Sequence, residues 1–223
     1  NPNKSVSQMR GLLKVVKKIP PFFAVPTTAG TGSEVTLAAV VSDPETHEKN
    51  ACNDPKLRPK YAVLDPELTT GLPPHITSTT GMDALTHAIE GYITKGAWEM
   101  SDMFEIEAIR MINKYLRTAV FEPTNPVGRN GMAVAQYIAG MAFSNVGLGV
   151  VHGMAHPMGS LFDIPHGVAN AMLLPTIMEF NAPVCLDKYV EIATSLKIPI
   201  GTVKAHINRA KIILKEQLKD YLC

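Results

Sequence analysis

The residue pattern of the chain changes near residue 72, and this change restricts the possible folds. Before it, short apolar and β-branched runs alternate with turn residues, as is typical of strands. The expected strands cover residues 22–25, 36–41 and 61–64. After residue 74, apolar residues recur at helical spacing. We therefore predict an α/β region over residues 1–72, followed by a mostly α-helical region over residues 73–223.

The helical region begins after two prolines, Pro73 and Pro74, and contains further glycine and proline breaks. The expected helices cover residues 77–92, 100–120, 127–145, 151–160, 166–181, 183–196 and 203–222. The helix over residues 127–145 carries almost no charge, so we expect it to be buried on most sides. In the α/β region, several charges and Asp-Pro pairs predict a surface loop or hairpin over residues 42–59.

Composition excludes several classes of protein. Apolar residues make up 46% of the chain and charged residues 18%, which predicts a folded core rather than disorder. The net charge of +1 argues against a nucleic-acid partner, and the absence of a long apolar run argues against a membrane span. The three cysteines, Cys52, Cys185 and Cys223, are far apart, which favours a reducing compartment such as the cytoplasm.

Asp83 and His87 are four residues apart in a predicted helix, so their side chains share one face and can reach one ion. Most pairs with this spacing are solvated side chains without a metal. Here the neighbours are apolar, including Met82, Ala84 and Leu85. A buried carboxylate and imidazole need partners, because burying an unpaired charge costs several kcal/mol, so a metal site becomes a serious hypothesis.

Three of the seven histidines, His152, His156 and His166, fall within 15 residues of nearly uncharged sequence. A core bend with hydrogen-bonded histidines is the alternative, but three histidines together favour a metal site. Asp83 and His87 together with His152 and His166 would supply one oxygen and three nitrogens, a set that suits Fe(II), Zn(II) or another divalent first-row ion. His156 would then lie beside the metal and could move protons as a general acid or base.

Four segments carry a resemblance to a known family. They are residues 26–36 (PTTAGTGSEVT), 81–90 (GMDALTHAIE), 152–157 (HGMAHP) and 165–170 (PHGVAN). In this order, over about residues 20–198, the chain resembles the iron-containing (group III) alcohol dehydrogenases. The resemblance implies an α/β nucleotide-binding region followed by a helical metal-binding catalytic domain, the architecture shared with dehydroquinate synthase.

The resemblance also implies roles for single residues. The implied metal ligands are Asp83, His87, His152 and His166, and His156 is the implied additional active-site histidine. The implied contacts to NAD or NADP are Thr27, Thr28, Ala29, Gly30, Thr31 and Lys49. The implied reaction is hydride transfer between the nicotinamide and a short-chain alcohol or aldehyde, with the metal stabilising negative charge on the substrate oxygen.

Family members also carry a Rossmann-like half with a glycine-rich phosphate loop, and nothing similar precedes Lys14. We therefore expect this chain to be a central segment that also lacks the C-terminal end of the family's helical domain. Strand edges exposed in such a segment would favour association, and a homodimer is a possible partner.

Two other functions remain open. One is a metal and NAD enzyme of the dehydroquinate synthase kind, which would need basic residues near the metal to hold a phosphate. The basic residues between Asp83 and Pro165 are Lys95, Arg110, Lys114, Arg117 and Arg129, none adjacent to the expected ligands. The other is a catalytically inactive fragment that binds metal. The identity of the alcohol and the choice between NAD and NADP stay open.

Overall fold

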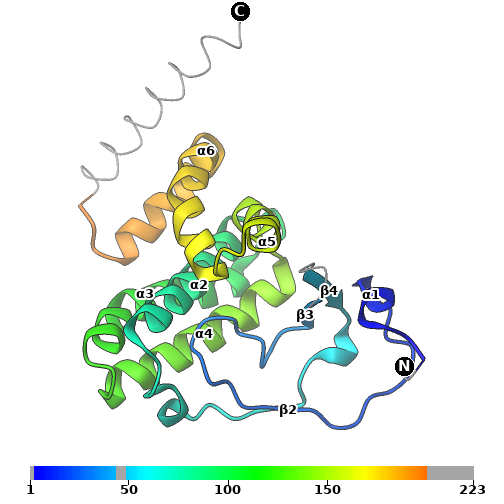
Figure 1. Cartoon of the computed structure of the whole chain (residues 1–223). Helices are drawn as coiled ribbons and strands as arrows, with labels where there is room; N and C mark the ends of the chain where they lie inside the picture. Colours follow the sequence, from blue (N-terminus) through cyan, green and yellow to red (C-terminus); the bar gives the residue numbers. More distant parts are fainter. Residues whose placement is uncertain (1–2, 44–48, 200–223) are drawn as a thin grey trace, which may run out of the picture.

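A computed structural model describes residues 3–43 and 49–199 of the chain. Strands and turns of the N-terminal region lie along one side of a group of helices (Figure 1). The model confirms the expected class, a small α/β part followed by a mostly helical part. The division into two domains at residue 72 stays a prediction, and the expected helix over residues 203–222 lies outside the described residues.

The described residues of the strand-rich part form two small sheets. One has the order β1-β4-β3, in which β3 (Ala38–Ser42) pairs antiparallel with β4 (Lys49–Asn53) and β1 (Gly11–Leu12) pairs parallel with β4. The register of the β3–β4 pair sets Ala38 against Asn53 and Ser42 against Lys49. The hairpin alternative for residues 42–59 is therefore the one that forms.

The second sheet consists of β2 (Phe23–Ala24) and β5 (Tyr61–Ala62), which pair parallel. Both strands are shorter than the expected runs. Where the structure describes this region, it also has three short helical turns, α1 (Val6–Met9), η1 (Pro55–Leu57) and η2 (Pro66–Thr69). The Asp54 side chain begins η1 by accepting a hydrogen bond from the Lys56 backbone N–H, and Asp65 caps η2 in the same way.

Five longer helices follow within residues 49–199, the second range that the structure describes. They are α2 (Pro74–Ile93), α3 (Glu99–Phe121), α4 (Pro126–Val146), α5 (Val150–Phe162) and α6 (His166–Ser195). The α6 helix joins two of the expected helices across a kink, where Cys185 has non-helical angles (φ −123°, ψ 19°) two residues after Pro183. The α4 helix begins where Asn125 accepts hydrogen bonds from two backbone N–H groups, and it ends at Gly147 with φ +85°.

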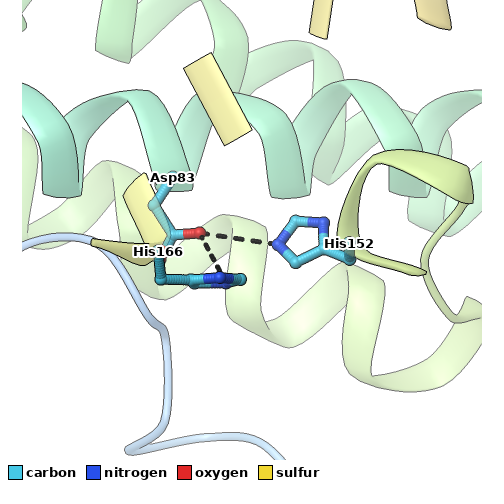
Figure 2. A group of neighbouring side chains, drawn as sticks. All are labelled: Asp83, His152 and His166. Carbon is cyan, nitrogen blue, oxygen red and sulfur yellow. Dashed lines mark ion pairs between the residues drawn. The ribbon is translucent and has the colours of Figure 1, made fainter. Parts of the chain in front are cut away.

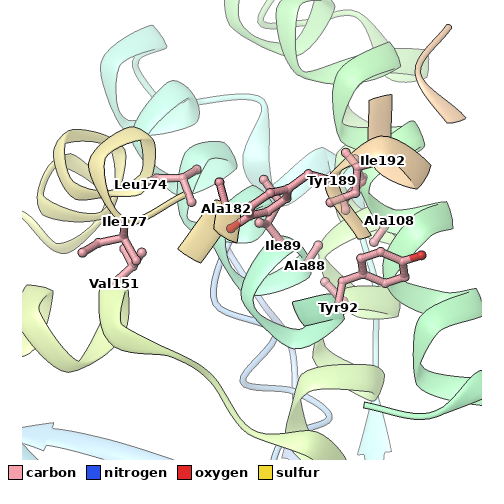
Figure 3. Packing of buried hydrophobic residues seen from close by; sticks show 12 residues of the cluster. Ala88, Ile89, Tyr92, Ala108, Val151, Leu174, Ile177, Ala182, Tyr189 and Ile192 are labelled. Atoms are coloured by element: carbon pink, nitrogen blue, oxygen red, sulfur yellow. The ribbon is translucent and has the colours of Figure 1, made fainter. Parts of the chain in front are cut away.

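The main core lies where α2 meets α3 and α6 (Figure 3). Most of its buried residues are small or branched, with Ala88, Ala108 and Ile109 at 0% exposure, and Tyr92 and Tyr189 are buried with them. Alanine along the contacts lets helix backbones approach closely, while Ile89, Leu174 and Ile192 fill the space between them. This packing holds the first half of α6 against α2, so it also sets where the first residue of α6 lies.

The α4 helix buries much of its surface in a second cluster that includes Met132 and Ala135, together with Ile112 of α3. Within the described part of the chain, no single helix has the length and apolar character needed to cross a membrane. Only α4 and α5 taken together have them, and that pair is bent by 103°.

Candidate metal centre

Side chains from three helices meet at one point: Asp83 from α2, His152 from α5 and His166 from α6 (Figure 2). The Nε2 atoms of His152 and His166 each lie 3.5 Å from Oδ1 of Asp83. The three candidate ligand atoms all lie within 4.8 Å of one another. Asp83 and His152 are buried, whereas His166 is partly exposed and opens the cluster to one side.

His87, one helical turn after Asp83, lies next to this group. Its Nε2 atom is 3.8 Å from Oδ1 of Asp83. The buried ring is stacked between Phe143 and His152, with centroid distances of 4.2 and 4.4 Å. The structure therefore gathers Asp83, His152 and His166 most tightly, and it places the fourth expected ligand at the edge of the cluster.

The spacing of these atoms fits a first-row metal ion. Ligand atoms bound about 2.0–2.2 Å from one ion are separated from each other by about 3–3.5 Å. Three imidazole nitrogens lie 3.5–3.8 Å from the same carboxylate oxygen, so small rotations of the side chains would complete such a shell. The donor set of one oxygen and three nitrogens suits Fe(II) or Zn(II).

The charges of the cluster also suit a cation. Burial alone would raise the pKa of Asp83, but the nearby imidazoles of His87, His152 and His166 outweigh it, so the pKa is lowered. Burial lowers the pKa of His87 and of His166 to about 4. At neutral pH Asp83 is therefore ionised and the rings of His87 and His166 are neutral with free lone pairs, the states in which these groups bind metals. Burial would also lower the pKa of His152, but its hydrogen bonds to Asp83 and Glu90 outweigh burial and raise it.

The turn between α5 and α6 brings His166 back to α2. Asp163 follows α5 with φ +52° in the left-handed region and reverses the chain, and Pro165 precedes the first residue of α6. Gly167 then allows close approach, because a Cβ at this position would overlap the carbonyl oxygen of Thr79 on α2. The start of α6 is thereby pressed against α2, one turn before Asp83.

His156 lies one turn after His152 on α5. Its ring centroid is 5.1 Å from that of His166 and 6.3 Å from that of His152. Burial lowers the pKa of His156, and the nearby charges of His152 and Lys49 lower it further. The ring lies beside the cluster but outside it, and its part in proton transfer stays a prediction.

A cavity of about 520 Å³ opens from the cluster toward the β3–β4 hairpin. The candidate ligands and His156 line one side. Small apolar residues, hydroxyl-bearing side chains and Asn53 of the strand-rich part line the other. Phe143 and Leu148 also line the cavity. Lys49 also lines the cavity and reaches across to α5, where its Nζ atom is 2.9 Å from the Cβ position of Gly159.

The expected cofactor residues are placed less uniformly. Thr31 and Lys49 line the cavity, whereas Thr27, Thr28, Ala29 and Gly30 are not among its lining residues. Ala29 is buried in the cluster with Ala84 and Ile112. A Cβ on Gly30 would lie 2.6 Å from the carbonyl oxygen of Thr80, so this glycine lets the turn approach α2. Their contacts to a nucleotide stay a prediction.

Two polar residues next to the cluster were not predicted as part of it. The Nδ2 atom of Asn170 donates a 2.7 Å hydrogen bond to Oδ1 of Asp83, and it lies 3.3 Å from Nε2 of both His152 and His166. Glu90 accepts a 2.6 Å hydrogen bond from Nδ1 of His152. The available signal was spacing, since Glu90 lies seven residues after Asp83 and Asn170 four after His166.

Two family models match the chain. One, described as Fe-containing alcohol dehydrogenase family, C-terminal, matches residues 77–221. The other, described as iron-containing alcohol dehydrogenase, matches residues 3–66. Together they include every residue of the cluster and of the β3–β4 hairpin.

Among curated proteins, lactaldehyde reductase of Escherichia coli (strain K12) is 47% identical over 195 residues, which are 87% of this chain and 50% of that protein. The chain thus spans about half the length of the curated relatives it matches. Among solved structures, a 1,3-propanediol oxidoreductase matches with TM-score 0.84 and 41% identity, over 92% of this chain and 56% of that one. Sulfoacetaldehyde reductase from Bifidobacterium kashiwanohense, in complex with NAD+, matches with TM-score 0.80 and 33% identity, over 94% and 56%.

Proposed function

This chain belongs to the iron-containing alcohol dehydrogenase family, and from that premise we propose that it is the metal-holding part of an oxidoreductase. The proposed reaction transfers a hydride between NAD or NADP and a short-chain alcohol or aldehyde. One observation carries the proposal: three imidazole nitrogens surround a single carboxylate oxygen at the side of a 520 Å³ cavity.

We propose Asp83, His152, His166 and the adjacent His87 as the residues that hold the metal. Iron(II) is the proposed ion, and zinc or another divalent first-row ion would suit the same donors. A bound ion supplies Lewis-acid stabilisation of negative charge on a substrate oxygen. The protein contributes the geometry, because Asn170 orients the carboxylate of Asp83 and Glu90 holds the ring of His152.

The remaining residues of the cavity would position substrate and cofactor. Half-buried His156 is the proposed proton carrier, since it lies beside the cluster and its lowered pKa leaves the ring neutral and able to accept a proton. Phe143 and Leu148 would exclude water near the cluster. Lys49 and Thr31 line the cavity near the hairpin, and we propose that they and the turn from Thr27 to Gly30 contact the nucleotide.

Several related statements stay predictions. The names of the relatives support a small alcohol or aldehyde as substrate class, but they do not identify which one. The structure of a relative with NAD+ supports a nicotinamide cofactor. The described cysteines, Cys52 and Cys185, are free, which supports the proposed location in the cytoplasm. A homodimer remains a proposal.

A phosphate-eliminating enzyme of the dehydroquinate synthase kind has less support. Lys49 is the one lysine or arginine among the described residues that line the cavity. Arg129, one of the basic residues considered above, is buried instead at the start of α4. Its guanidinium donates to the carbonyls of Pro123 and Leu72 and to the hydroxyl of Thr77.

The decisive experiment measures bound metal and activity in the same samples. The full chain is loaded with Fe(II) or Zn(II), and its metal content is determined by elemental analysis. Oxidation of propane-1,2-diol is followed through NADH absorbance. We expect His152→Ala to lose both metal and activity, whereas His75→Ala, which changes an exposed histidine at the start of α2, retains both.

Each other outcome has a defined meaning. Activity that survives removal of the metal by a chelator would contradict the proposed scheme. Metal that is retained without any NADH formation would identify the inactive metal-binding fragment instead. A wild-type chain that retains no metal would refute the metal centre itself.

A further inference from the structure

The carboxylate of Glu90 lies beneath the first turn of α5, although Glu90 itself belongs to α2. Its Oε1 atom accepts a 2.7 Å hydrogen bond from the backbone N–H of Val151. Its Oε2 atom accepts a 3.3 Å hydrogen bond from the backbone N–H of His152 and the 2.6 Å hydrogen bond from Nδ1 of the same residue. Glu90 is 1% exposed, so these hydrogen bonds form away from solvent.

The α5 helix depends on this carboxylate for its N-terminal cap. Its own N-cap residue, Gly149, makes no side-chain cap hydrogen bond. The first N–H groups of a helix have no partner within the helix, and a negative charge is favourable beside them. Gly149 leaves the space for the carboxylate, because a Cβ at that position would lie 2.7 Å from Oε1 of Glu90.

The same carboxylate determines which nitrogen of His152 faces the candidate metal centre. Since an ionised carboxylate can only accept, the Nδ1–H of His152 donates to Glu90. In the neutral ring the other nitrogen, Nε2, then carries a lone pair, and it lies 3.5 Å from Oδ1 of Asp83. Asp83, His87 and Glu90 follow at intervals of four and three residues on one face of α2, so a single helix supplies two candidate ligands and the support for a third.

We propose that Glu90 is a positioning residue for the metal centre, which couples the docking of α5 to the orientation of His152. The proposal rests on the proposed metal-binding function. Carboxylates that hold a ligating histidine through its second nitrogen fix the ring and its tautomer, and their loss typically weakens metal binding by about 10–100-fold. The alternative is that Glu90 only caps α5 and has no effect on the metal.

Two variants disturb this carboxylate in different ways. Glu90→Gln keeps the shape of the side chain, but its amide NH2 group cannot accept a hydrogen bond. Gly149→Ala keeps every polar group and displaces the carboxylate with a methyl group. The matched controls are Glu107→Gln, which changes a half-exposed residue of α3, and Gly153→Ala on α5, where a Cβ would meet no atom within 4 Å.

The experiment determines the dissociation constants of the full chain for Zn(II) and Co(II) by competition with a chromophoric chelator. Co(II) absorption reports ligand geometry, and thermal unfolding of the metal-free chain reports the cap. We expect Glu90→Gln and Gly149→Ala to bind both ions roughly 10–100-fold more weakly, with a changed Co(II) spectrum. Both controls should bind as the wild type does.

A lower unfolding temperature of the metal-free variants, with unchanged affinities and spectrum, would show that Glu90 is only a cap and would overturn the proposal. Because affinity is measured without substrate or nicotinamide, this failure is distinct from failure of the proposed function. A wild-type chain that binds neither ion would refute the metal centre. Tight binding of the ions by the wild type, with unchanged dissociation constants for the variants, would refute only the role of Glu90.

Discussion

The strand-rich part and the helices differ in how their side chains are buried. The strands of the β2–β5 pair are two residues long, and Phe23, Tyr61 and Val63 beside or within them are each about half exposed. In the helices, by contrast, Ile109 and Ile112 are at most 1% exposed. The candidate ligands all come from the well-packed helices, whereas most expected cofactor residues lie in the turn before β3.

Hydrogen bonds join the strand-rich part to α4. Gln136 of this helix accepts a 2.7 Å hydrogen bond from the backbone N–H of Gly32 and donates to the buried carboxylate of Glu34. The hydroxyl of Ser144 accepts a 3.2 Å hydrogen bond from the backbone N–H of Leu37. The contrast suggests that metal binding and nucleotide binding can be weakened separately, by different substitutions.

The largest expected effect on the free energy of unfolding comes from truncating one apolar side chain to alanine in each of the two parts. Ile112→Ala removes a fully buried side chain from the contact of α3 with α2 and α4, and we expect it to lower the free energy of unfolding by about 2–5 kcal/mol. Val63→Ala, at a half-exposed position after β5, should cost less than about 1 kcal/mol. Urea unfolding followed by circular dichroism measures both, and equal losses would contradict the contrast drawn above.

An intermediate effect is expected from the connection between the two parts. Gln136→Ala leaves the Gly32 N–H and the Glu34 carboxylate without this partner, which should cost roughly 1–3 kcal/mol. Because the turn is released while the ligand helices remain, affinity for NADH should fall several-fold and affinity for Zn(II) should not change. Asn145→Ala, on an exposed position of the same helix, is the control. A parallel loss of both affinities would show that the two parts do not act separately.

The smallest effect concerns pH. Burial raises the pKa of Glu105 on α3 well above its usual value near 4.5, and repulsion from Asp102 raises it further. Since the folded state then binds this proton more tightly than the unfolded state, the contribution of Glu105 to stability is highest below about pH 4.5 and falls as the pH rises toward the raised pKa. Among the described residues, neither carboxylate oxygen of Glu105 has a hydrogen-bond partner.

We therefore expect Glu105→Gln to lose less stability than the wild type between pH 4.5 and pH 7, by on the order of 1 kcal/mol. Glu107→Gln, at a half-exposed position nearby, should follow the wild-type profile. Urea unfolding at several pH values measures the difference. Identical profiles for Glu105→Gln and the wild type would show that Glu105 does not titrate in this range.

Local sequence patterns predicted the helices because apolar periodicity and proline breaks act within a few residues. The same patterns were less accurate where distant contacts decide. Pro183 suggested a break between two helices, yet α6 continues through a kink at Cys185. The β4 strand is polar at Lys49, Asn50 and Asn53, so composition alone left a loop and a hairpin both possible; pairing with β3 makes it a strand.

The same distinction between local patterns and distant contacts applies to the residues of the candidate site. Spacing alone placed Asp83 and His87 on one face of a helix and suggested His152 and His166, from a later segment, as their partners. The structure brings Asp83, His152 and His166 together. The supporting residues were not predicted, because their roles depend on partners far along the chain. Glu90 is 62 positions from His152, and Asn170 is 87 positions from Asp83.

These long separations have a consequence for the order of assembly. Each helix can form from neighbouring residues, but the carboxylate and the imidazoles converge only after α5 and α6 have docked on α2. During synthesis, Asp83 and His87 emerge well before His152 and His166, and the nascent chain then holds only half of the donors. Capture of an ion by the proposed ligands would therefore be a late event, which follows the collapse of the helices rather than directing it.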